Sequence, residues 1–111
     1  MNNTIRVSVD INTAERLVQN EVIQGSITGE MLDRHMIHSG SGTCVCMVFE
    51  KHYYRVGNRL TLTVVIDDFE GATRVHYVSG GGSTNALFNF DWGASDKFSR
   101  VVEQALGSYR I

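Results

Sequence analysis

Polar and apolar residues alternate strictly near the start of the chain. In the segment "TIRVSVD", residues 4–10, the side chains of Ile5, Val7 and Val9 occupy one side and polar side chains the other. A period of two residues is typical of a strand with one buried face. We therefore predict a half-buried strand here.

The apolar spacing then changes to three and four residues, which predicts a helix over residues 13–24. The apolar stripe of this helix consists of Ala14, Leu17, Val18 and Val22. Asn12 and Glu15 resemble a capping box at its start, and Gly25 is a natural helix end.

Residues 27–38 fit two patterns. Their apolar positions could share a helical face, but Gly29 weakens a helix start, so a strand is preferred and a helix stays open as the alternative.

From Thr43 onward, β-branched and aromatic residues dominate. Three strands are expected, in the segments "TCVCMVFEKHYYRV", "RLTLTVVID" and "TRVHYVS". Gly57-Asn58 is predicted to form a two-residue hairpin turn, because glycine accepts the positive φ that such a turn requires. The buried face of the middle strand is expected to carry Leu60, Leu62, Val64 and Ile66.

Aromatic residues at every second position, Phe88, Phe90 and Trp92, predict one more strand after the glycines Gly80–Gly82. A final amphipathic helix follows, opened by Ser95 or Asp96. Its buried stripe is expected to consist of Phe98, Val101, Val102, Ala105, Leu106 and Tyr109.

The predicted order is therefore β-α-β-β-β-β-β-α. Short turns between consecutive strands imply an antiparallel meander, and two amphipathic helices can cover one of its faces. The expected fold class is α+β, with residues 1–111 forming a single domain. In this two-layer sandwich, a curved antiparallel sheet packs against the C-terminal helix.

Composition narrows the possible partners. The chain has 111 residues, 42% of them hydrophobic, and a net charge of −2. This charge balance argues against electrostatic capture of nucleic acid, and no apolar run is long enough to span a membrane. The N-terminal segment lacks the features of a signal peptide, and two cysteines suit a reducing compartment. A cytoplasmic protein is expected.

Two longer segments carry a resemblance to known proteins. "VFEKHYYRVGNRLTLTVVIDD" and "LFNFDWGASDKF" resemble an uncharacterised family of small bacterial proteins, a domain of unknown function, over residues 43–106. The order of elements is also similar to a shortened helix-grip fold of the Bet v 1/START-like kind. That resemblance implies an apolar ligand between sheet and helix. The family resemblance transfers no catalytic residue.

Motifs that would carry chemistry are absent from the sequence. "GGGSTNA" has no lysine for a phosphate-binding loop, so the glycines are interpreted as a corner of the sheet. Cys44 and Cys46 lie on one side of a strand and are expected to be buried free thiols. Glu50 and His52 share a strand face, but without a clear third ligand no metal site is predicted. No catalytic residue and no cofactor are predicted.

The surplus of aromatic residues suggests a non-enzymatic binding module that holds a small apolar ligand between sheet and C-terminal helix. Its candidate ligand-binding residues are Phe49, Tyr53, Phe88, Phe90 and Trp92. The alternative is a protein–protein or self-association domain, such as a homodimer, that uses a β edge or a sheet face. The uncharged sheet face suited to that role is expected to consist of Thr61, Thr63, Val65 and Thr73. A basic patch around Lys51, Arg55 and Arg59 is interpreted as a charged, aggregation-resistant edge.

Overall fold

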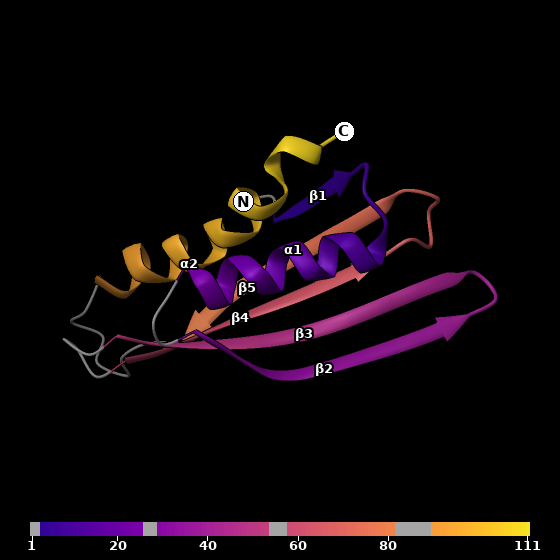
Figure 1. The fold of residues 1–111 in the computed structure, drawn as a ribbon. Coiled ribbons are helices and arrows are strands. Elements are labelled where there is room, and N and C mark those ends of the chain that lie inside the picture. Colours follow the sequence, from indigo (N-terminus) through magenta and orange to yellow (C-terminus); the bar gives the residue numbers. More distant parts are fainter. Residues whose placement is uncertain (1–2, 26–28, 54–57, 82–89) are drawn as a thin grey trace.

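A computed structural model describes residues 3–25, 29–53, 58–81 and 90–111, without the side chains of 53, 58 and 90–97. Within these residues, two helices and five strands follow one another, with a short 3-10 helix at the end (Figure 1). Their bounds are β1 Thr4–Val7, α1 Ile11–Gln24, β2 Glu30–Ser39, β3 Gly42–Tyr53, β4 Asn58–Asp67, β5 Thr73–Gly81, α2 Phe90–Leu106 and η1 Gly107–Tyr109.

The five strands form one antiparallel sheet in the order β1-β5-β4-β3-β2. The chain enters at one edge with β1, crosses the sheet through α1, and returns strand by strand from β2 to β5. Both helices lie on the same face of the sheet (Figure 1). Helix α1 contacts β3 and β4, and helix α2 contacts β4 and β5. The predicted two-layer α+β class is confirmed.

One predicted strand is wrong. Phe90 and Trp92 belong to α2, which begins at Phe90, while Phe88 lies outside the described residues. The order of the described elements is thus β-α-β-β-β-β-α. Three aromatic residues spaced by two are too few to outweigh the helical spacing that follows, since Phe90 stands a multiple of four residues before the buried Phe98 and Val102.

The first helix is confirmed, but its start differs from the expectation. Asp10 is the N-cap, and its carboxylate accepts a hydrogen bond from the Thr13 backbone N–H at 2.8 Å. Hydrogen bonds from Thr13 lower the pKa of Asp10. The proposed capping box of Asn12 and Glu15 is therefore wrong, because the chain turns into the helix two residues earlier.

The preferred strand within residues 27–38 is confirmed as β2. The hairpin between β3 and β4 also forms, but Asn58 already pairs with Tyr53 inside the sheet. Asn58 therefore lies in β4 rather than in the predicted turn, and Gly57, with residues 54–56, lies outside the described part of the chain.

Both layers contribute to a hydrophobic core between the helices and the inner face of the sheet. The expected buried residues of β4 are all inaccessible to solvent, as are Phe98, Val102 and Leu106 of α2. Val101 and Ala105 are partly buried against them, whereas Tyr109 is exposed. Each fully buried aliphatic side chain contributes about 1.5–3 kcal/mol, so this double layer is the main source of stability.

A partly buried ion pair connects α1 to the edge strand β2. Glu15 is 6% exposed, and its carboxylate accepts hydrogen bonds from Nε and Nη2 of Arg34, the second at 3.2 Å. Gln19 Nε2 donates to the same carboxylate at 3.1 Å. These bonds raise the pKa of Arg34, which stays charged. Because β2 buries little apolar surface, this cluster anchors the edge strand under the helix.

We expect Arg34→Met to lower the Tm by about 5 °C or more, because it leaves the buried Glu15 carboxylate without its main partner. Arg6→Met is the matched control, since Arg6 pairs with Glu70 at 3.8 Å between two exposed side chains. That substitution should lower the Tm by less than about 2 °C. Thermal unfolding measures both values, and equal losses would contradict the anchoring role.

A second polar contact joins the sheet to α2. The Tyr77 hydroxyl donates a hydrogen bond to Glu103 Oε1 at 2.9 Å from within the inner face of β5. Burial, and then the contact with the Glu103 carboxylate, raise the pKa of Tyr77 to about 12. Tyr77 therefore stays neutral well above the pH at which an unfolded tyrosine ionises.

This shift predicts a stability contribution that is full below about pH 10 and is lost as the pH rises towards 12, because the unfolded state ionises first. A tyrosinate absorbance titration should show a late component that Tyr77→Phe removes and Tyr109→Phe retains. Glu103→Gln should move that component to lower pH. A late component that persists in Tyr77→Phe would show that another tyrosine is responsible.

Candidate functional site

The outer face of the sheet carries the main candidate surface, because neither helix covers it. Residues that alternate with the buried inner positions point to this face, and the strand register arranges them in rows. One central row joins Cys46 and Val65 of neighbouring strands, and the next row joins Val48, Thr63 and Val78. The face is thus organised by β3, β4 and β5.

The centre of this outer face is neutral and built from small or β-branched side chains. Val48, Thr63 and Val65 are half-buried, and Val78 is 48% exposed. Thr61 also lies on this face, as expected, but Thr73 is buried on the inner face. The surface expected for sheet pairing therefore forms without Thr73. The Thr73 side chain points to the same side of β5 as the buried Val75 and Tyr77.

Cys44 and Cys46 lie on this face, and both are free thiols with intermediate exposure. The prediction of free cysteines is confirmed, although they are half-buried rather than fully buried. Burial raises the pKa of Cys44, with a further contribution from the nearby Asp67 carboxylate. Its thiol is therefore protonated and weakly nucleophilic at neutral pH.

Charged groups stand at the margins of the outer face. Near one end, Arg74 pairs with Asp67 at 3.2 Å and with Glu70, and these contacts raise the pKa of Arg74.

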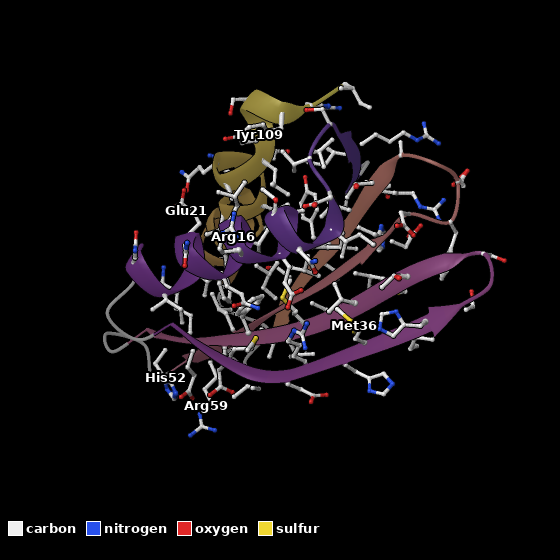
Figure 2. The ribbon with its side chains drawn as sticks, turned by 45° about the vertical axis from the view of Figure 1, so that its right-hand side comes forward. Arg16, Glu21, Met36, His52, Arg59 and Tyr109 are labelled. Atoms are coloured by element: carbon white, nitrogen blue, oxygen red, sulfur yellow. The ribbon has the colours of Figure 1, made fainter. Side chains whose placement is uncertain are left out.

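At the other end, His52 and Arg59 form a cross-strand pair and project away from the helices (Figure 2). Lys51 lies instead over the Phe98 ring of α2, at 5.9 Å from its centroid. Among the described residues, the suggested basic patch of Lys51 and Arg59 is therefore divided between two faces, and Arg55 lies outside the described chain.

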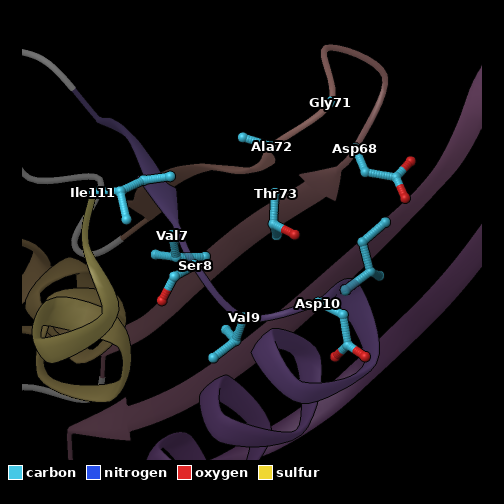
Figure 3. A pocket seen from close by; sticks show the side chains of 10 residues that line it. Val7, Ser8, Val9, Asp10, Asp68, Gly71, Ala72, Thr73 and Ile111 are labelled. Atoms are coloured by element: carbon cyan, nitrogen blue, oxygen red, sulfur yellow. The ribbon is translucent and has the colours of Figure 1, made fainter.

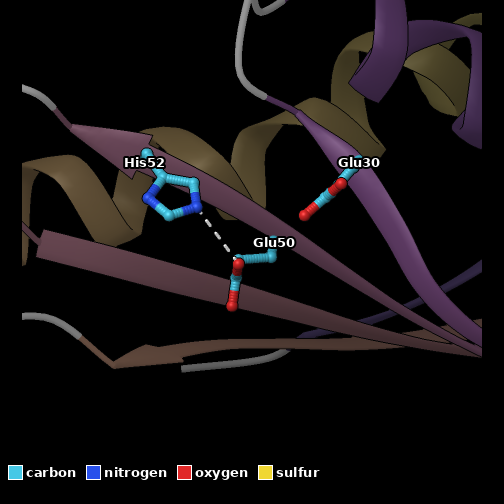
Figure 4. Close-up of side chains that lie close together, drawn as sticks. All are labelled: Glu30, Glu50 and His52. Atoms are coloured by element: carbon cyan, nitrogen blue, oxygen red, sulfur yellow. Dashed lines mark ion pairs between the residues drawn. The ribbon is translucent and has the colours of Figure 1, made fainter.

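Beside His52, two carboxylates from neighbouring strands converge (Figure 4). Glu30 of β2 pairs directly with Glu50 of β3, and His52 lies two residues further along the same face. His52 Nε2 is 3.2 Å from Glu50 Oε1. One ligand-type atom from each of these three residues lies within 4.8 Å of the others. Here the sequence interpretation missed Glu30, the third ligand that it required for a metal site.

A shallow pocket of ≈ 420 Å³ opens at the end of the sheet where β1 leads into α1 (Figure 3). Its walls include Val9, Asp10, Asp68 and Ile111. Both carboxylates already have structural partners, because Asp10 caps α1 and Asp68 accepts a hydrogen bond from the Thr43 N–H at 2.8 Å. This pocket is explained by the loop packing around it.

The predicted ligand-binding residues separate into two groups. Phe49 is fully buried on the inner face of β3, within the core beneath the helices. The side chains of Tyr53, Phe90 and Trp92, and the whole of Phe88, lie outside the described residues. The proposed apolar ligand site therefore stays a prediction.

Comparison with known proteins agrees with the resemblance found in the sequence. A family model described as a family of unknown function, DUF6054, matches residues 2–110. The chain belongs to the DUF6054 family. No match was found among curated proteins or among solved structures, so the helix-grip likeness stays a prediction. In the described part of this DUF6054 chain, neither helix is long and apolar enough to cross a membrane.

Proposed function

We propose that the protein is a self-association module in which the outer sheet faces of two copies pack together. One observation carries this proposal: both helices lie on one side, which leaves the other face of the sheet uncovered, with neutral Val48, Thr63 and Val65 at its centre. Interfaces concentrate apolar groups at their centre and charges at their rim. The distribution of Val48, Val65 and Val78 against Glu30 and Arg74 follows that pattern.

The size of the face suits a dimer. The five strands contain 45 residues. At about 3.3 Å per residue and about 4.8 Å between strands, they cover roughly 700 Å² in projection. Because side chains project from the sheet, its accessible area is larger than its projected area and comes close to the ~800 Å² that each partner buries in a stable complex. Only an occupant that covers most of the sheet would reach this value.

A second copy of the chain is the occupant that fits best. Twisted sheets pack face to face with about 10 Å between them, and their side chains interdigitate. A two-fold axis near Thr63 and Val65 would place the neutral centre of one copy on the neutral centre of the other. The charged margins of each copy would remain at the rim, in contact with solvent.

Sedimentation velocity tests this proposal with two matched substitutions. Val78→Lys places a charge on the outer face, and Ile23→Lys places one on α1, where the original side chain is 50% exposed against 48% for Val78. We expect a concentration-dependent dimer whose dissociation constant rises at least about tenfold in Val78→Lys and is unchanged in Ile23→Lys, because a buried lysine would have to be desolvated.

A strict monomer at all concentrations would overturn the proposal. A dimer that is weakened by Ile23→Lys and unaffected by Val78→Lys would do the same, because it would locate the interface on the helical layer.

We also propose a cytoplasmic location. The two unpaired thiols support it, because such groups persist in reducing compartments. Fractionation of cells that produce the untagged chain tests this location, and recovery outside the cytoplasm would contradict it.

A further inference from the structure

Glu30 and Glu50 form an unfavourable pair. They occupy directly opposed positions on β2 and β3, where like charges destabilise a sheet. Glu30 makes no ion pair with any other residue that the structure describes, and the Glu50 side chain is only 13% exposed. An arrangement that opposes local stability is most easily understood where it has a function.

His52 completes a set of donors rather than a simple acidic cluster. Its Nε2 faces Glu50 Oε1, so a ring nitrogen and carboxylate oxygens from two strands point to one volume. Imidazole and carboxylate together are ligands typical of zinc and neighbouring first-row metals. Magnesium and calcium instead prefer sites made of oxygen alone.

We propose that Glu30, Glu50 and His52 bind a divalent transition-metal ion of the zinc type. At metal–ligand distances of about 2.1 Å, two ligands of a tetrahedral ion lie about 3.4 Å apart. The Glu50–His52 pair already has a separation of 3.2 Å, and all three donors lie within 4.8 Å. A small rotation of the exposed Glu30 side chain would bring its carboxylate within bonding distance of the ion held by Glu50 and His52.

Three protein ligands leave a fourth position open to solvent, because Glu30 is exposed and the His52 side chain is 36% exposed. The ion would also connect β2 to β3 near the start of the edge strand, and binding should therefore stabilise the fold. The site lies at the margin of the outer face, and all three ligands come from one copy of the chain, so metal binding does not depend on the proposed dimer.

Isothermal titration of the metal-free full chain with Zn²⁺ tests the site. We expect one strong binding event and a rise in Tm on adding the metal. His52→Ala and Glu30→Gln should each weaken binding at least about tenfold, because a direct ligand is lost. Glu30→Gln removes a like-charge contact, so the variant should fold at least as well as the original chain. Mg²⁺ should bind at least about tenfold more weakly than Zn²⁺.

Two controls address other zinc ligands on the same face. His35→Ala and the double substitution Cys44→Ser/Cys46→Ser remove donors that lie outside the proposed site, and both should bind Zn²⁺ as the original chain does. Binding that survives in His52→Ala, or that is lost with the cysteines, would overturn the proposal. Equal affinity for Mg²⁺ would also overturn it, since it would indicate simple attraction to acidic groups.

The same titration in Val78→Lys keeps the two proposals distinguishable. Unchanged zinc affinity in that variant supports a site within one copy of the chain. If Val78→Lys loses zinc binding while His52→Ala still binds Zn²⁺, the metal would belong to an interface between copies instead.

Discussion

One-sided burial of the sheet is the constraint on which the rest of the structure depends. The central strand β4 presents Leu60, Leu62, Val64 and Ile66 to the helices, and all four are inaccessible to solvent. Helix α1 covers the half of the sheet towards β3, and α2 covers the half towards β5. Because both helices are needed on one face, none is left among the described elements for the other. The inner face provides stability, and the outer face is available for binding.

The edges of the sheet are stabilised by polar contacts rather than by apolar burial. Strand β2 is exposed along nearly its whole length, and the Glu15–Arg34 pair attaches it to α1. A register shift between Met31 and Asp33 interrupts this edge, as bulges commonly do in strands that must avoid uncontrolled pairing. The same shift places Glu30 opposite Glu50. The edge and the proposed metal site thus have a common structural origin.

Periodicity predicted most of the fold because it reports which side of an element is buried. The alternation of β4 and the four-residue spacing of Phe98, Val102 and Leu106 both gave the correct buried faces. It failed for Phe90 and Trp92, whose spacing of two residues is typical of a strand although both lie in the first turn of α2. The Asp10 cap was missed because a capping side chain depends on where the backbone turns, which apolar spacing does not report.

The candidate sites were harder to predict because they depend on the contacts between strands. Glu50 and His52 were recognised as sharing a face from their spacing alone, whereas Glu30 enters through a pairing that includes a bulge. A sequence shows no signal for such a register until the hairpin is known. The outer face was partly recognised through Thr61, Thr63 and Val65, because the alternation within β4 shows which side chains share a face. Thr73 was misplaced, because it alternates in step with the buried Val75 and Tyr77 of β5 and therefore points to the inner face.

The reactivity of Cys46 tests most directly whether the outer face is open in one copy and covered by another. In Cys44→Ser, Cys46 is the only thiol of the chain. If the outer faces of two copies pair, Cys46 in the folded protein should react with a maleimide at low protein concentration and become protected as the concentration rises through the association range. Protection at every concentration would contradict an open face, and a rate independent of concentration would contradict pairing through it.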